Sequence, residues 1–562
     1  MVPVHLPPKE LAALRLLLEN FGKIVTPQQL RTALWGEVHV TDDSIPKCLS
    51  SLRAHLGPEE YIQTIYKQGY KLSVATPATT DAQESKPLPR LTILPFATEF
   101  GVPEYLGTHT AEEAMTLLVH MDPPLVITLA RDSVFTLARR GLSALEVGRL
   151  LQADLALAGT IRTLPGHYRF RIELIRVADG AQVWVEDMLI EHGRTDGLES
   201  ELARQLLFHL RASLSQDAHF AWSATTITED RQQELDTPQH REAYEIYQHA
   251  HHEWQSLQRH RMQDGLQRLQ RATEIDPSLT EARVDLVELS IAQELYGFMA
   301  PTIVAELVQR AASQIPHPER SAPRILPQLG WINFHVHRDL SNALQLFALS
   351  AHLPHESWIT ASRILFTLSR RRFDEALEIL DTAIQSDPFS PALHARRAWA
   401  LHLKGDAEAS VWQMRQTLEK FPEQESLALY AAMIFAYNGM PEEAVNFARD
   451  LARHQPYFDP AMATHAYALA TAGKHDEARQ ILERLQWLSR ERFVISSFTP
   501  AAWVALGDFH AALEALSSAD QARCPWFFSA LADPRLAPLA TYPEFQKMQQ
   551  MAEELASNVV YC

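Results

Sequence analysis

The segment NGMPEEAVNFARDLARHQP, residues 438–456, has a related copy 34 residues upstream, KGDAEASVWQMRQTLEKFP, residues 404–422. The same step of 34 residues separates five positions in this part of the chain, namely Arg371, Gly405, Gly439, Gly473 and Gly507. A period of this length is typical of stacked helix–turn–helix units, because one helix pair cannot bury its apolar face alone. The sequence therefore predicts an α-solenoid for the C-terminal half of the chain.

Small residues and prolines follow the same period. The equivalent places at multiples of 34 residues hold Ala376, Ala444, Ala478 and Ala512, with Ser410 in the remaining one. We expect these small side chains where the two helices of a pair approach closely. We expect the second helix of each pair to end at a proline, Pro388, Pro422 or Pro456. The whole pattern resembles tetratricopeptide repeats.

Less regular copies of the repeat lie upstream, at residues 264–277, 304–316 and 342–354. Together they predict a solenoid of about seven or eight helix pairs over residues 240–520, followed by a helical cap at 521–562. Such a solenoid offers a groove for a peptide or helix of a protein partner, or a face for self-association. The sequence leaves both alternatives open.

Residues 1–75 have a different pattern. Leucines at helical spacing between Leu11 and Leu18 predict a first helix, and the apolar pair Ile24-Val25 follows it. Thr26-Pro27-Gln28-Gln29 predicts a capped start of a second helix, and Ser44 to Leu56 predicts a third. Two strands, at residues 61–65 and 70–73, complete the pattern. Three helices followed by a hairpin predict a winged helix.

This segment resembles the OmpR/ToxR-type (OmpR/PhoB-type) winged-helix domain. The likeness rests on Leu34-Trp35-Gly36, on the helix with Leu52-Arg53, and on Ile62-Gln63-Thr64-Ile65 followed by Gly69-Tyr70-Lys71-Leu72. It implies that the third helix enters the major groove of double-stranded promoter DNA and that the wing reaches the adjacent minor groove. The residues implied at base edges are Ser44, Lys47, Ser51 and Cys48, and those at phosphates or the minor groove are Arg53, Lys67 and Lys71.

Two further expectations come from the same resemblance. The loop with Trp35, Glu37 and His39 is one that touches RNA polymerase in this family, although core packing is an equal alternative for Trp35. The family domain begins with a small sheet, of which only residues 2–6 have a counterpart here. We therefore expect either that the natural chain starts upstream of Met1 or that the sheet is lost.

Residues 76–90 are rich in Pro, Ala and Thr and predict a linker. Beyond it, residues 91–220 alternate between strand and helix patterns, which predicts an α/β domain. This segment resembles the small TolB-N-like module, on the stretches Ile93-Leu94-Pro95-Phe96, Leu157-Ala158-Gly159-Thr160 and Asp179-Gly180-Ala181-Gln182-Val183-Trp184. The resemblance implies a fold and no chemistry.

Composition and motifs point away from catalysis and from membranes. The chain of 562 residues has 46% hydrophobic and 21% charged residues and no apolar run of about 18 residues. It has no GxxxxGK[ST], GxSxG or Rossmann glycine motif, and His249, His251, His252 and Glu253 lack the HExxH spacing. Cys48, Cys524 and Cys562 are too scattered for a disulfide framework or zinc site. We expect a cytoplasmic protein that is not an enzyme and has no cofactor or metal.

The sequence thus predicts a multidomain, mainly α protein: a winged helix-turn-helix, a small α/β domain and a tetratricopeptide solenoid. This order resembles the HilA-type activators of bacterial virulence genes, which implies a DNA-binding activator of a secretion or invasion locus. Two alternatives remain open. One is an adaptor or chaperone scaffold whose winged helix binds protein, and the other is a regulator gated by a ligand in residues 91–220.

Overall fold

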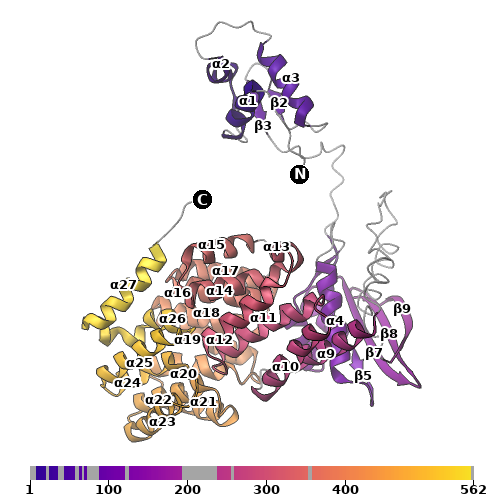
Figure 1. The fold of residues 1–562 in the computed structure, drawn as a ribbon. Coiled ribbons are helices and arrows are strands. Elements are labelled where there is room, and N and C mark those ends of the chain that lie inside the picture. Colours follow the sequence, from indigo (N-terminus) through magenta and orange to yellow (C-terminus); the bar gives the residue numbers. More distant parts are fainter. Residues whose placement is uncertain are drawn as a thin grey trace. The chain divides into compact units, whose positions relative to one another are not determined.

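The computed structural model describes residues 8–19, 24–35, 44–56, 62–65, 69–72, 88–119, 126–192, 237–254, 259–351, 353 and 357–557. The chain forms two compact units, Met1–Pro87 and Leu88–Cys562. Figure 1 shows their helices and strands. Most of the expected linker, and the end of the expected α/β range beyond residue 192, lie outside the described residues.

The N-terminal unit has the predicted three helices and wing. Its elements are α1 (Pro8–Glu19), β1 (Ile24–Val25), α2 (Pro27–Trp35), α3 (Ser44–Leu56), β2 (Ile62–Ile65) and β3 (Gly69–Leu72). Leu17, Leu30, Leu49 and Leu52 are fully buried and form its core. The start of α2 is capped as expected, since the Thr26 N–H donates to Gln29 Oε1 at 2.9 Å and the Gln29 N–H donates to Thr26 Oγ1 at 3.3 Å. The winged helix is confirmed.

A third strand joins the wing. The sheet order is β1-β3-β2, with all pairs antiparallel, so the apolar pair Ile24-Val25 extends the hairpin to three strands. Gly69 makes this possible because it has a φ of 145°, and a Cβ there would lie 2.2 Å from the carbonyl oxygen of Val25. No other residue type allows β1 and β3 to come so close at this point.

The second unit begins with a mixed sheet and three helices. The elements are β4 (Arg90–Ile93), β5 (Ala97–Thr98), α4 (Glu104–Val119), β6 (Ile127–Thr128), α5 (Arg131–Arg139), α6 (Ala144–Leu150), β7 (Leu155–Leu164), β8 (His167–Arg176) and β9 (Gln182–Glu191). The strand order is β6-β4-β7-β8-β9, with β5 also beside β7. Strand β4 pairs in parallel with β6 and β7, whereas β7, β8 and β9 are antiparallel. The predicted α/β module is present.

Helix α5 was not expected from the sequence. It is short, and its N-cap residue Ala130 has no side chain that could bond to the first turn. Helix α6 begins instead with a complete capping box between Ser143 and Glu146. The cap is the local signal that the sequence of α5 lacks.

The rest of the second unit is a helical solenoid, and Figure 1 shows its helices following one another from α9 to α25, with α26 back against α16. Eight helix pairs are found in the described residues: α9 (Pro238–Trp254) with α10 (Arg259–Ile275), α11 (Thr280–Leu295) with α12 (Pro301–Ser313), α14 (Leu326–His335) with α15 (Leu340–Leu349), α16 (Ser357–Ser369) with α17 (Phe373–Ser386), α18 (Pro391–Lys404) with α19 (Ala407–Lys420), α20 (Leu427–Tyr437) with α21 (Pro441–His454), α22 (Asp459–Thr471) with α23 (His475–Leu488), and α24 (Pro500–Ala505) with α25 (Phe509–Gln521).

Shorter elements connect and follow these pairs. They are α13 (Pro318–Ser321), η1 (Pro323–Ile325), η2 (Ser496–Phe498), α26 (Phe527–Leu531), η3 (Pro534–Thr541) and α27 (Pro543–Ser557). The last three form the helical end that the sequence analysis expected after residue 520. The tetratricopeptide-like class of the solenoid is confirmed.

The residues at the 34-residue step all have left-handed backbone. Gly405, Gly439, Gly473 and Gly507 have φ between 75° and 89°, and Arg371 has a φ of 58°. Each ends the first helix of a pair, where a left-handed residue reverses the chain into the second helix. The periodic Ala376, Ser410, Ala444, Ala478 and Ala512 are fully buried in the second helices. The period in the sequence therefore records one turn and one close helix contact in each repeat.

Arg371 tests this explanation, because it carries a Cβ where its repeats carry glycine. A left-handed non-glycine residue costs about 1 kcal/mol. We expect Arg371→Gly to unfold at a higher urea concentration than Arg371→Ala, by about 1 kcal/mol of unfolding free energy. Both variants lose the same weak ion pair to Glu553, so Arg371→Ala is the matched control. Equal urea midpoints for Arg371→Gly and Arg371→Ala would show that the left-handed turn is not strained.

Candidate nucleic-acid interface and the α/β–solenoid junction

One face of α3 is open to solvent. The opposite face is buried, with Ile45, Leu49 and Leu52 in the core. Lys47 and Ser50 are exposed. Ser44 and Ser51 are half-buried beside them. Ser50 was not among the DNA-contacting residues expected from the sequence. Its position three residues after Lys47 nevertheless places it on the same face of the helix.

Cys48 does not belong to this exposed face, so its expected contact with base edges is wrong. Its side chain is only 8% exposed and packs in the core of the domain. At about 100° per residue, position 48 lies beside Ile45 and Leu52 on the helix and not beside Lys47. Burial raises the pKa of the Cys48 thiol, and the negative charge of Glu10 adds to the increase. The thiol is therefore a neutral core group.

Arg53 has a contact within its own domain. Its Nε and Nη2 atoms both donate to the carbonyl oxygen of Ile62, at 3.0 and 2.7 Å. The guanidinium therefore ties α3 to β2 and helps to set the angle between the helix and the wing. Its expected contact with a phosphate stays a prediction.

The other expected site residues are only partly described. Lys71 lies in β3, where it pairs with Ile24 and Gln63. Lys67, Glu37 and His39 lie outside the described residues. Trp35 is half-buried against the core, and the Lys9 ammonium lies 5.2 Å from its ring centroid. This packing supports the core role of Trp35, and a polymerase contact stays a prediction.

The burial of Cys48 leads to a chemical test. We expect the Cys48 thiol to react with iodoacetamide at least about tenfold more slowly in the native protein than in the unfolded chain, because only the exposed thiolate reacts. Lys47→Cys provides the control, since a thiol at this exposed neighbouring position should react rapidly in the native protein. Peptide mass spectrometry reads the two sites separately. Rapid native labelling of Cys48 would contradict its place in the core.

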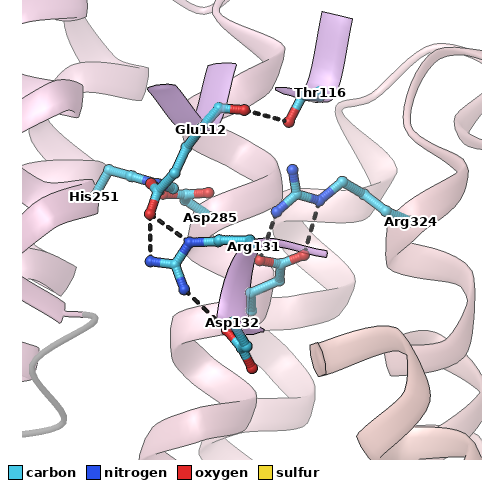
Figure 2. A network of polar contacts seen from close by, with 8 residues as sticks. Glu112, Thr116, Arg131, Asp132, His251, Asp285 and Arg324 are labelled. Atoms are coloured by element: carbon cyan, nitrogen blue, oxygen red, sulfur yellow. Dashed lines mark hydrogen bonds and ion pairs between the residues drawn. The ribbon is translucent and has the colours of Figure 1, made fainter. Parts of the chain in front are cut away.

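A buried polar network joins the α/β module to the first helices of the solenoid (Figure 2). Glu112 of α4 accepts hydrogen bonds from the Arg131 guanidinium and lies 2.8 Å from His251 Nε2 of α9. His251 Nδ1 in turn lies 2.5 Å from the carboxylate of Asp285 in α11. Glu112, His251 and Asp285 are all less than 10% exposed. One histidine thus connects two carboxylates from two parts of the unit.

The charges in this network stabilise one another. Burial alone would raise the pKa of Glu112, but the charge of Arg131 and the bond to His251 hold that pKa well below its usual range. Burial alone would lower the pKa of His251, but Asp285 and Glu112 raise it well above its usual value. We infer that His251 is a cation at neutral pH, held between two anions. Removing one member would leave the others as unpaired buried charges.

A second contact joins the same module to the middle of the solenoid. The Ser133 hydroxyl of α5 donates to the Asp387 carboxylate and accepts a hydrogen bond of 2.7 Å from the Phe389 N–H. Nearby, the Arg140 guanidinium donates to the carbonyl oxygen of Lys420 at 2.7 Å. Burial and the neighbouring Asp132 charge raise the pKa of Asp387 to about 7. The module is therefore held at two separate places along the solenoid.

The raised pKa of Asp387 makes stability depend on pH. The native state keeps this proton up to about pH 7, whereas an unfolded Asp releases it near pH 4, so native stability falls as pH rises through that window. We expect Asp387→Asn to raise the thermal midpoint by about 2 °C or more at pH 8 and to change it little at pH 5. The same change at exposed Asp450 is the control. An equal effect of Asp387→Asn at both pH values would contradict this explanation.

The described part of the chain shows neither a membrane-spanning helix nor a cluster of metal ligands. None of its helices combines the length and the low polarity that crossing a bilayer requires. Within the same ranges, no group of three or more His, Cys, Asp or Glu side chains is placed to hold a metal ion. His251 is engaged by carboxylates, and the ring of His249 lies tilted against that of Tyr105, with 4.2 Å between the ring centroids.

Comparison with known proteins gives the class of the N-terminal unit. Residues 2–72 match the family "Transcriptional regulatory protein, C terminal", which agrees with the three helices and the wing. The unit is an OmpR/PhoB-type winged-helix domain of a transcriptional regulator.

The similarity to one kind of regulator extends over most of the chain. The chain is 20% identical over 487 residues to the transcriptional regulator HilA of Salmonella typhi, covering 86% of this chain and 78% of that protein. The HilA of Salmonella typhimurium (strain LT2) is equally similar, with the same identity and coverage. This is weak homology to HilA over most of the chain.

Solved structures resemble the helical part more distantly. The APC/C hetero-tetramer Cut9-Hcn1 gives a TM-score of 0.39 at 16% identity, covering 65% of this chain and 67% of that one. Yeast Tom70 gives a TM-score of 0.34 at 12% identity, covering 63% of this chain and 78% of that one. At these scores neither likeness supports an argument about this protein.

Proposed function

We propose that this protein is a sequence-specific regulator of transcription that reads double-stranded promoter DNA with α3. The match of residues 2–72 to a regulatory-protein domain carries the proposal. The exposed face of α3 supports it, because Lys47, Ser50 and Ser51 are side chains that bond to base edges or phosphates. Helix α3 has no acidic residue that would repel DNA.

The distribution of charge along the chain limits how such a protein can bind DNA. Residues 1–76 carry eight Lys and Arg and seven Asp and Glu side chains, so the net charge of −18 comes entirely from the rest of the chain. A nearly neutral DNA-binding domain gains little affinity for DNA in general, and an acidic body reduces indiscriminate binding. Binding therefore depends on a few well-placed cations such as Lys47. Chromosomal DNA as the ligand implies that the protein acts in the cytoplasm.

The finer part of the proposal concerns the genes and the partners. By its homology to HilA, we propose that the protein activates genes of a secretion or virulence locus. The solenoid would serve binding to another protein or to a second copy of the chain, and the loop after Trp35 would serve RNA polymerase. In this proposal the chain acts by binding, without catalysis.

Lys47 provides the test of DNA reading. We expect Lys47→Gln to weaken binding of the full chain to labelled genomic promoter fragments by about tenfold, and to reduce the slope of affinity against salt by about 1. Lys547→Gln removes an equally exposed charge from α27 and should leave binding unchanged. Electrophoretic mobility shifts at two salt concentrations measure both effects.

The outcomes of this titration separate the proposal from the adaptor alternative. Selective binding to some fragments that depends on Lys47 supports a regulator that reads DNA. Binding that is equally weak for all fragments, or unchanged in Lys47→Gln, contradicts it. Capture of a protein partner through the N-terminal unit, without DNA binding, would favour the adaptor.

A further inference from the structure

A cavity of about 2030 Å³ lies between the α/β module and the solenoid. The module contributes the loop after β4 and the start of α5, including Pro95 and Arg131. The solenoid contributes residues of α10, α18 and α20 and the loop at residues 455–458. Pockets for small molecules typically measure about 300–1,000 Å³. The larger volume suits a peptide segment better than a single small molecule.

The network of Figure 2 lines one part of this cavity, and there the cations pair with carboxylates. Arg131 pairs with Glu112, and Arg324 pairs with Glu288 through two bonds of 2.8 and 2.9 Å. The acidic side chains of the lining all have a hydrogen-bonding or ionic partner: Glu112, Asp132, Glu288, Asp387, Glu423 and Glu425. Each acidic side chain of the described lining is therefore already engaged by a neighbouring group.

Elsewhere the lining carries cations without anions. Arg139, Arg259 and Arg396 line the cavity, and within the described ranges none of them forms an ion pair. The guanidinium of Arg259 lies over two aromatic rings, 5.6 Å from the centroids of both Phe298 and Tyr457. The cavity thus has an excess of positive charge, in a body whose net charge is strongly negative.

Arg396 is the most unusual of these cations. It is half-buried in α18, and its Nη1 atom is buried without a hydrogen-bond partner. The Tyr430 hydroxyl is hydrogen-bonded to the Arg396 side chain, and Tyr296 lies close enough to Arg396 for its titration to sense the charge. Burial raises the pKa of Tyr296 to about 12 and also raises that of Tyr430, so both hydroxyls are neutral. The Arg396 guanidinium thus has a neutral partner but no counterion, and an anion at Nη1 would compensate for its partial desolvation.

Aromatic rings connect Arg396 to Arg259. Tyr296, beside Arg396, lies 6.0 Å from Phe298, which is beneath Arg259. Tyr296 also lies 5.3 Å from Phe458, and the neighbouring Tyr457 is 62% exposed. Arginines beside exposed rings can hold both a carboxylate and the apolar part of a ligand.

We propose that this cavity binds an acidic peptide segment of a partner protein, with one carboxylate on Arg396 and apolar side chains against the rings beside Arg259. A single-stranded nucleic acid also suits rings and arginines, but the acidic body repels a chain that is charged along its whole length. The inference rests on the proposed role of the solenoid in binding protein. It does not depend on DNA binding by α3.

The test uses the full-length protein and an array of labelled ten-residue peptides. Half of the peptides contain Asp and Glu, and the matched half replace each by Asn or Gln with the aromatic content unchanged. We expect fluorescence anisotropy to show binding of acidic peptides only, and Arg396→Gln to weaken it by at least about tenfold. Arg396→Lys keeps the charge but not the planar fork of the guanidinium. Its affinity for acidic peptides should therefore lie between those of the unchanged protein and of Arg396→Gln.

Arg449→Gln is the control, because Arg449 is a half-exposed solenoid arginine outside the cavity lining. Unchanged promoter binding and circular dichroism of Arg396→Gln show that the variant is folded. Equal binding of acidic and neutral peptides, or no loss in Arg396→Gln, overturns the proposal. It is also wrong if succinate, inorganic phosphate or a single-stranded oligonucleotide binds in an Arg396-dependent way and no acidic peptide does. None of these outcomes bears on the DNA-reading proposal, which Lys47 tests.

Discussion

The left-handed residue between the helices of each pair is the constraint on which the solenoid depends. At Gly405, Gly439, Gly473 and Gly507 the chain reverses without a steric penalty, so the second helix can return along the first. The helices then approach closely only because the facing positions are small, as at Ala444 and its equivalents. Since successive pairs repeat this geometry, they stack in chain order and together form the surface of the solenoid.

The α/β module meets that surface through polar groups as well as through packing. Glu112, His251 and Asp285 form a buried chain of charges at one place, and Ser133 and Asp387 form a hydrogen bond at another. Buried ion pairs add less net stability than apolar contacts of similar size, because both partners lose water. Buried ion pairs instead favour one specific geometry, because few other arrangements would give each of these charged groups its partner. The cavity between the two places follows from this arrangement.

The N-terminal unit concentrates its chemistry on a narrow strip. Most of α3 serves the core or the contact with the wing: Leu49 and Leu52 are buried, Cys48 is a core thiol, and Arg53 bonds to Ile62. In the proposed function, the face around Lys47 and Ser50 is what remains for DNA. A regulator with so few cations must rely on the fit of the helix to its site and on partners held by the rest of the chain.

The sequence by itself determined the winged helix, the α/β module and the solenoid, because caps, turn residues and a 34-residue period are local or repeated signals. It also placed Lys47 correctly on the exposed face of α3. It did not show that Cys48 is buried, that Arg53 bonds to Ile62, or that α5 exists, since these depend on neighbouring elements or lack a cap. Only the tertiary structure brought Glu112 to His251 and left Arg396 without an anion. Whether a side chain has a partner depends on residues far away in the chain, and no local sequence pattern shows which distant residues come together.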